Sequence, residues 1–366
     1  FNLGDLMGDN AALLKFLSVN GRATIQELAQ KFGMKPEEVS KDLEELSSRE
    51  GLTFAPEINF ENLWLMEFAK QARQQTKRGI IGEASEIVAN AGFSEYLLKL
   101  DFESMPKYEE LANATSTKEK YVQFLATTKS KKAYGYVLAR TYDDISYIVR
   151  GIQSKLSKYQ FTLSVIRIFP EWGFFPIDTD MINSFKLFDS YKNLLLGFTK
   201  RGRAPFSEIG AEYGQGSTQM LYAYDRLIRT RVLKWVTYYI ANISQYSIAF
   251  LELTLKGSGF EKEKEKWYLK MVKSEVCPYV YMARMLSPLG YFGILAFQDK
   301  DELEKEINAL SKFKYAESKV EMLDKILVGK IGLRYFDMRY SSAYAYLESK
   351  GLVERQSLPS PGAGYI

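Results

Sequence analysis

Histidine is absent from this chain of 366 residues, and cysteine occurs once, as Cys277. Without histidine there is no imidazole for general acid–base catalysis, for a serine–histidine triad or for a histidine-bearing metal site. A single cysteine excludes an intramolecular disulfide and a thiolate zinc site, and it suits a reducing compartment. These absences favour a protein that is not an enzyme and that needs neither a cofactor nor a metal.

The sequence also lacks a signal-peptide pattern and any run of about 18 apolar residues. We therefore expect no membrane partner and a soluble, cytoplasmic protein. Hydrophobic residues make up 46% of the chain, which is enough for packed cores. The net charge is only +4, so the placement of charges has to indicate any nucleic-acid partner.

An internal repeat organises the sequence. Residues 21–52 align with residues 202–233 without a gap, and both stretches start with Gly-Arg-Ala. Two copies in register indicate a duplication. The identical pairs are Gly21/Gly202, Arg22/Arg203, Ala23/Ala204, Glu27/Glu208, Gly33/Gly214, Leu46/Leu227 and Leu52/Leu233.

Each copy has the pattern of a helix, a tight turn with glycine and a second helix. This pattern is typical of a helix-turn-helix, whose second helix enters the DNA major groove. The second helix of the later copy, 217–231, has three arginines and one acid, whereas its counterpart 36–50 has six acids and two basic residues. Phosphates attract the basic helix 217–231 and repel the acidic helix 36–50. The later helix-turn-helix is therefore expected to be the main DNA reader. The predicted DNA-binding residues are Arg203, Ser217, Thr218, Gln219, Tyr222, Arg226, Arg229 and Arg231, with Arg22, Lys35 and Lys41 from the first copy.

Alternating strands and helices follow each helix-turn-helix. Strands are predicted at 94–102, 121–128, 134–140 and 160–169, with helices at 105–114 and 143–157, which is the β-α-β-β-α-β order of a ferredoxin-like unit. The same order recurs after residue 244. Helices cover only one face of such a sheet, so its aromatic strands predict a partner for the other face.

The predicted fold class is α+β, with two winged or plain helix-turn-helix domains alternating with two ferredoxin-like domains. The predicted domains are 1–58 (first helix-turn-helix), 59–92 (helical insertion or linker), 93–170 (first ferredoxin-like domain), 171–189 (linker), 190–243 (second helix-turn-helix), 244–324 (second ferredoxin-like domain) and 325–366 (tail).

These elements resemble the Lrp/AsnC family of transcription regulators. Residues 20–30, NGRATIQELAQ, followed by Lys31, Phe32, Gly33 and Met34, look like the opening of that family, and the resemblance covers about 9–169 and 190–323. It implies a transcription regulator or nucleoid-associated protein that binds double-stranded DNA in the nucleoid. It also implies RAM (ferredoxin-like) sheets that self-associate, either as an intramolecular pseudo-dimer or in a homo-oligomer.

The same resemblance indicates where a small-molecule effector would bind. Family members that bind amino acids tend to carry a Gly-Asp-Tyr-Asp-like turn before the third RAM strand. In this chain that place is occupied by Tyr134 in the first copy and by Gly290 and Tyr291 in the second. Neither of the two acids of the turn is present in either copy. They are weak candidates for ligand binding, and an effector is left open.

Two other classes of function are compatible with this architecture. Siroheme decarboxylases share it, but their chemistry is thought to depend on histidine, so the sequence favours a DNA-binding regulator over an enzyme. A protein-interaction module is the other alternative, in which the acidic helix 36–50 meets a basic partner.

Overall fold

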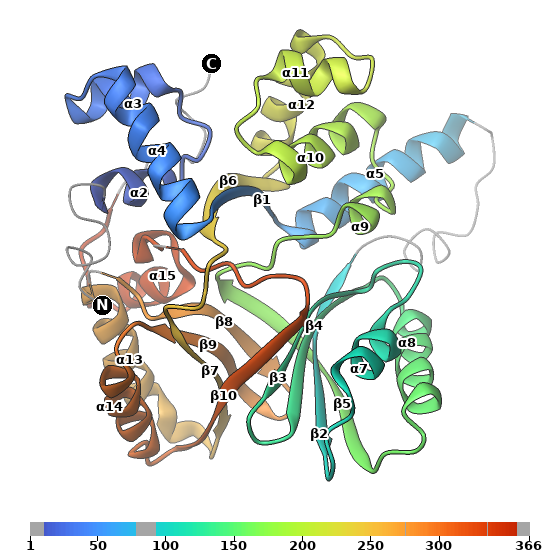
Figure 1. Ribbon diagram of the computed structural model, residues 1–366, viewed down its shortest axis with the longest axis vertical. Helices are drawn as coiled ribbons and strands as arrows, with labels where there is room; N and C mark the ends of the chain where they lie inside the picture. Colours follow the sequence, from blue (N-terminus) through green and yellow to red (C-terminus); the bar gives the residue numbers. More distant parts are fainter. Residues whose placement is uncertain (1–10, 78–92, 275, 335, 357–366) are drawn as a thin grey trace.

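The computed structural model describes residues 11–77, 93–274, 276–334 and 336–356 (Figure 1). Two helical units lie above a short two-stranded ribbon, and a large closed sheet with helices on its outer side lies below it. This α+β arrangement matches the predicted alternation of domains. None of the described helices is both long and apolar enough to span a membrane.

The first helical unit contains α2 (Ala11–Leu17), α3 (Ile25–Phe32) and α4 (Pro36–Glu50). A capping box between Thr24 and Glu27 begins α3, and Pro36 occupies the first turn of α4. The second unit contains α10 (Asp189–Arg201), α11 (Phe206–Glu212) and α12 (Ser217–Arg229). Gly216 is the N-cap of α12, and Ser217 is the first helical residue.

A strand follows each helix-turn-helix, and the two strands pair with each other. Strand β1 (Leu52–Ile58) runs antiparallel to β6 (Leu233–Ile240), with Leu52 opposite Ile240. Neither helix-turn-helix therefore stands alone, because the ribbon joins the two copies. From β1 the chain enters α5 (Phe60–Lys77), and α9 (Thr179–Asn183) lies in the later linker.

Each copy then builds a four-stranded unit. The first has β2 (Ser94–Phe102), α7 (Tyr108–Thr115), β3 (Val122–Thr128), β4 (Lys132–Ala139), α8 (Tyr142–Lys155) and β5 (Phe161–Trp172). The second has β7 (Ser247–Leu255), α13 (Glu261–Lys273), β8 (Tyr279–Leu286), β9 (Leu289–Phe297), α14 (Lys300–Ser311) and β10 (Ala316–Val328). Both follow the predicted β-α-β-β-α-β order.

The two units close into one antiparallel sheet with the order β10-β3-β4-β2-β5-β8-β9-β7. Strand β5 pairs first with β2 and then with β8, and β10 pairs first with β7 and then with β3. Each copy thus lends its last strand to the other. The face that helices leave uncovered packs against the second copy, so the described residues form the intramolecular pseudo-dimer.

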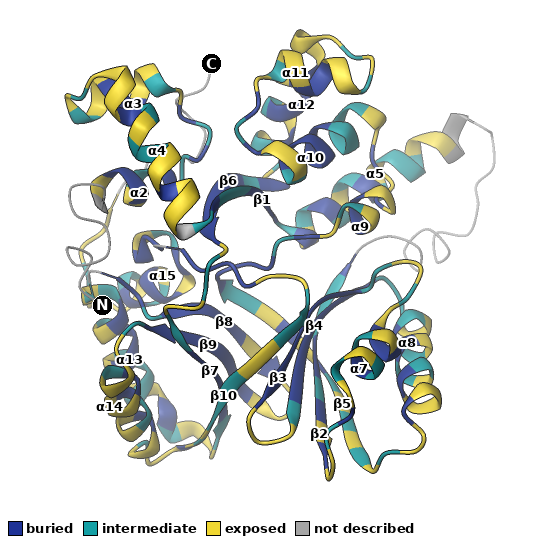
Figure 2. Cartoon of the chain, in the orientation of Figure 1, coloured by how far each residue is buried: buried dark blue, intermediate teal, exposed yellow. Residues whose placement is uncertain are grey.

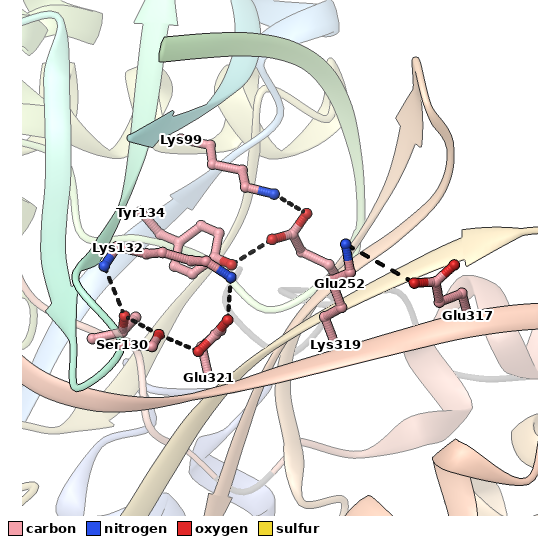
Figure 3. Close-up of polar contacts among 9 residues, drawn as sticks. Lys99, Ser130, Lys132, Tyr134, Glu252, Glu317, Lys319 and Glu321 are labelled. Atoms are coloured by element: carbon pink, nitrogen blue, oxygen red, sulfur yellow. Dashed lines mark hydrogen bonds and ion pairs between the residues drawn. The ribbon is translucent and has the colours of Figure 1, made fainter. Parts of the chain in front are cut away.

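The interior of the closed sheet is aromatic, with Tyr134, Phe250 and Phe292 in contact near its middle. Figure 2 shows its strands largely buried, while the outer surfaces of the surrounding helices are exposed. At one end Lys99 and Tyr134 of the first copy both meet Glu252 of the second, with Lys99 Nζ 2.7 Å from the carboxylate (Figure 3). Lys132 and Ser130 contact Glu321 beside them. These contacts join the first copy to the second, and the Tyr134–Glu252 hydrogen bond among them is buried.

The C-terminal segment packs against the second unit. It contains a short 3-10 turn at Met338–Tyr340 and the helix α15 (Ser342–Ser349). Arg334 is buried, and Leu333 beside it forms a bridge with Ile240 of the ribbon.

Candidate functional site

A cavity of about 590 Å³ lies between the ribbon, the start of α5 and the end of the closed sheet where β2 begins. Eight aromatic, four cationic and three acidic side chains are among the residues that line it. The lining residues used below are Glu57, Phe60, Trp64, Phe93, Glu95, Tyr136, Arg140, Arg167, Phe169, Phe174, Phe175, Lys234, Tyr281 and Arg284.

Glu95 and Tyr136 form a hydrogen-bonded pair at the inner end of this cavity. Residues alternate between the two faces of β2, so Glu95 points to the same side as buried Leu97. The Tyr136 hydroxyl, on neighbouring β4, donates to the Glu95 carboxylate. Burial raises the pKa of Glu95 to about 7, although this hydrogen bond and the nearby charges of Lys234 and Arg167 lower it. The carboxyl therefore takes up and releases a proton near neutral pH.

Tyr281, on β8 of the second copy, completes the inner end. Its side chain is 2% exposed, and its hydroxyl has no hydrogen-bond partner among the described residues. Burial, and next the charge of Glu95, hold the pKa of Tyr281 well above its ordinary value, so the hydroxyl keeps its proton. A buried hydrogen-bond donor without an acceptor is costly, and an acceptor atom of a bound ligand would remove that cost.

The mouth of the cavity is cationic. Arg167 is exposed, lies 5.3 Å from the Phe169 ring centroid, and has no carboxylate within ion-pair distance among the described residues. Arg284 stands opposite Phe169 across the seam of β5 and β8, and its Nε is 2.7 Å from Glu171. Lys234 Nζ is 3.6 Å from Glu57. Arg284 and Lys234 therefore already lie beside carboxylates, and Arg167 is the cation of the three that favours an anionic ligand.

Buried ion pairs hold the walls in place. Arg140 binds Glu67 of α5 through two nitrogens, at 2.8 and 2.9 Å, and its guanidinium lies 4.1 Å from the Phe93 ring centroid. Arg334 Nη2 is 2.8 Å from Glu57, and both side chains are almost fully buried. The first pair fixes α5 on the sheet, and the second fixes the ribbon on the C-terminal segment, so the cavity is preformed.

The predicted DNA-binding residues on and just after α12 are exposed, as an interface with DNA requires. Tyr222 is 71% exposed, and Arg229 is paired with Asp225 at 2.9 Å within the same helix. Arg231 lies just beyond the end of α12. The exposed residues of this prediction are Ser217, Thr218, Gln219, Tyr222, Arg226, Arg229 and Arg231, with Lys35 and Lys41 in the first copy.

Arg22 and Arg203, predicted to contact DNA phosphates, instead contact the backbone of the opposite copy. Arg22 Nη1 donates to the backbone oxygens of Gly202 and Ala204, both at 2.9 Å. Arg203 donates in return to the backbone oxygens of Gly21 and Ala23. Because each guanidinium binds the opposite copy, these two arginines join the helix-turn-helix units, and we assign them to that contact instead of to phosphates.

The three weak ligand candidates are not brought together. Tyr134 points into the closed sheet, whereas Tyr291 packs on its outer side against Phe260 and Trp267. Gly290 lies directly against the backbone of Leu253. None of the three lines the cavity, which is built instead from residues that the sequence analysis did not single out. One signal was available: Glu95 is an acid on the inward-facing side of a predicted strand.

The whole architecture is similar to that of a known enzyme. The crystal structure of the siroheme decarboxylase NirDL matches with a TM-score of 0.54 and 13% identity over 93% of this chain and 98% of that chain. NirDL in complex with an iron-uroporphyrin III analogue matches with a TM-score of 0.53 and 11% identity over the same shares. The regulator LrpC of B. subtilis covers 38% of this chain and 95% of its own, at a TM-score of 0.32 and 15% identity. No family model and no curated protein sequence matches significantly.

This similarity corrects the expectation that the chain is not an enzyme. The two-copy fold, over nearly its full length, is one that a decarboxylase also has. The expectation rested on the absence of histidine, but acid–base chemistry near neutral pH needs only a group with a suitable pKa. Glu95, with a pKa of about 7, is such a group.

Proposed function

We propose that this chain is a decarboxylase of a planar, polycarboxylated, tetrapyrrole-like molecule, which binds in the cavity beside Glu95. The observation that carries the proposal is the Glu95 carboxyl, with a pKa of about 7, at the inner end of an aromatic cavity with a cationic mouth. Phe174, Phe175 and the other ring side chains suit a flat apolar ring system, and Arg167, Arg284 and Lys234 suit its carboxylates.

Decarboxylation breaks the bond between a substrate carbon and its carboxylate. The electron pair of that bond stays on the substrate carbon while CO₂ leaves, and the carbon then needs a proton. Glu95 in its protonated form supplies that proton, and Tyr136 holds the carboxylate that remains until solvent reprotonates it. The step consumes one proton and needs no oxidant.

Incubation of the purified chain with siroheme tests the proposal. We expect release of CO₂ and loss of the corresponding mass from the substrate. Glu95→Gln keeps the shape of the side chain but removes the acid, so it should lower the rate by about 10²–10⁴-fold while ligand binding persists. Glu304→Gln, on the exposed surface of α14, is the matched control and should keep the full rate.

Two results would contradict this proposal. One is the absence of CO₂ release from siroheme by the intact chain under reducing conditions. The other is an unchanged rate for Glu95→Gln, which would show that another group donates the proton.

DNA binding by α12 is the second candidate function. The observation that favours it is the exposed run of Ser217, Thr218 and Gln219 at the start of α12, followed by exposed Arg226 and Arg229 on the same helix. Buried Met220, Ala223 and Leu227 anchor the opposite face, so these side chains stand outward on a rigid element.

A salt titration tests this second function. The double variant Arg226→Ala/Arg229→Ala should weaken binding to duplex DNA and reduce the slope of log affinity against log salt by about one unit for each lost phosphate contact. Arg150→Ala, an exposed arginine on α8, is the control. An unchanged affinity and slope in the double variant would place any DNA contact elsewhere.

A further inference from the structure

We propose that each chain holds one ligand site, and that this site is composite, completed only when Tyr281 and Arg284 of the second copy meet Glu95 of the first. The inference takes its ligand class from the proposed function, but it concerns binding and not turnover. It follows from a comparison of the two halves of the closed sheet.

The two seams of the sheet are equivalent points in the repeat. At one seam β5 ends at Gly173, which packs against Val280 and Tyr281. At the other, β10 ends near Gly329, which packs in the same way against Gln123 and Phe124. Both glycines have positive φ, 82° and 70°. The counterpart of Tyr281 is therefore Phe124.

Strand registers give the counterparts of the other site residues. Ser94 and Ser247 begin equivalent strands, so Glu95 corresponds to Ile248. Leu97 stands opposite Tyr136, and the equivalent Phe250 stands opposite Ile294. Likewise Arg167 corresponds to Met322, Arg284 to Thr127, and Lys234 to Thr53.

The equivalent place at the other seam therefore lacks the polar and charged groups that line the cavity. Where the cavity has a carboxyl and two phenol hydroxyls, the counterpart has Ile248, Ile294 and Phe124, each at most 3% exposed. Where the mouth has two guanidinium groups and an ammonium group, the counterpart has Met322, Thr127 and Thr53. These residues offer neither a proton donor of suitable pKa nor a cation for a carboxylate.

The complete site also crosses the copies. Glu95, Tyr136 and Arg167 come from the first copy, and Tyr281, Arg284 and Lys234 come from the second. A dimer of two first copies would place Glu95 beside Phe124, and a dimer of two second copies would place Ile248 beside Tyr281. Only a first copy paired with a second copy brings all six site residues together. Because both copies belong to one chain, that pairing always forms.

Titration of the full chain with iron-uroporphyrin III, followed by absorbance and calorimetry, tests the inference. We expect one molecule bound per chain. Tyr281→Phe should weaken binding about tenfold, because it removes the unpartnered hydroxyl. The variant introduces the residue that the fold already accepts at position 124, so folding should be kept, and circular dichroism checks this. Tyr147→Phe, an exposed tyrosine on α8, is the control and should bind as the wild type.

A second variant checks the location. Glu95→Ile introduces the residue of the inactive counterpart, and we expect binding to be lost without a new site appearing. Two molecules bound per chain, no binding at all, or an unchanged affinity in Tyr281→Phe would each overturn the inference. One molecule bound by a chain that releases no CO₂ would refute the decarboxylase proposal and leave this inference standing.

Discussion

At the scale of single residues, Glu95 shows how burial can give a carboxyl the working range of an imidazole. Its hydrogen bond from Tyr136 and the charges of Lys234 and Arg167 favour the ionised form, but burial outweighs them and brings the pKa to about 7. Tyr281 is too strongly shifted upward to ionise in this range. A chain without histidine thus has a group that titrates near neutrality in the cavity between the ribbon and the closed sheet.

The activity of the chain should depend on pH through this group. If protonated Glu95 is the acid, kcat/KM for decarboxylation should be high below about pH 7 and fall tenfold per pH unit above it. A pH profile measured with siroheme checks this. A rate that rises through the same range would show that Glu95 acts as a base.

The stability of the fold should depend on pH in the same range. The folded state keeps the Glu95 proton up to about pH 7, whereas an unfolded glutamate releases it near 4.5. Between these values the folded state binds more protons, so the free energy of unfolding should fall as pH rises. The full loss is on the order of 3 kcal/mol at 1.36 kcal/mol per unit, less any solvent screening in the cavity. Urea denaturation of the wild type and of Glu95→Gln across this range checks it, since the variant should lack this contribution.

At the scale of elements, the paired strands β1 and β6 turn two helix-turn-helix units into one body. Arg22 and Arg203 reinforce this pairing by binding the backbone at the start of the opposite unit. The Arg22 guanidinium also lies 4.5 Å from the Phe206 ring centroid. The arginine that both copies have at this position therefore contacts the opposite copy in each case.

Removal of Arg22 should destabilise this contact without changing the salt dependence of DNA binding. Arg22→Ala leaves two backbone carbonyls without their charged donor, and hydrogen bonds to charged groups contribute about 1.5–3 kcal/mol each. We expect a loss of about 2–4 kcal/mol in chemical denaturation, with Arg150→Ala close to the wild type. A flattened salt slope in Arg22→Ala would instead support the predicted phosphate contact.

At the scale of the whole molecule, the exchange of the last strands makes the two copies one closed sheet. Gly329 directly follows the part of β10 that pairs with β3 of the other copy, and its φ of 70° and its approach to Gln123 leave no room for a side chain. The two copies also differ in the residues that they contribute to the candidate sites. The first supplies Glu95 to the cavity, and the second presents the arginine-bearing helix α12.

A methyl group at this seam should weaken the closure. Gly329→Ala combines an unfavourable backbone conformation with a steric clash, and we expect a loss of at least about 2 kcal/mol in the free energy of unfolding. Gly151→Ala, within helix α8 where a Cβ meets nothing within 4 Å, should stabilise the chain by up to about 1 kcal/mol. Equal effects of both variants in thermal denaturation would mean that the seam does not depend on this glycine.

The sequence by itself determined the duplication, the helix-turn-helix units and the two β-α-β-β-α-β orders. It could do so because caps such as Thr24, turns and apolar periodicity act over a few residues, and because identical pairs such as Arg22 and Arg203 stand in register. Only the tertiary structure decided that β5 and β10 exchange partners, that Arg22 faces the opposite copy, and that Glu95 lies beside Tyr136 and Tyr281. Tyr281 is 186 residues from Glu95 in the chain. The pKa of a carboxyl depends on how deeply such distant residues bury it, and no local pattern encodes that burial.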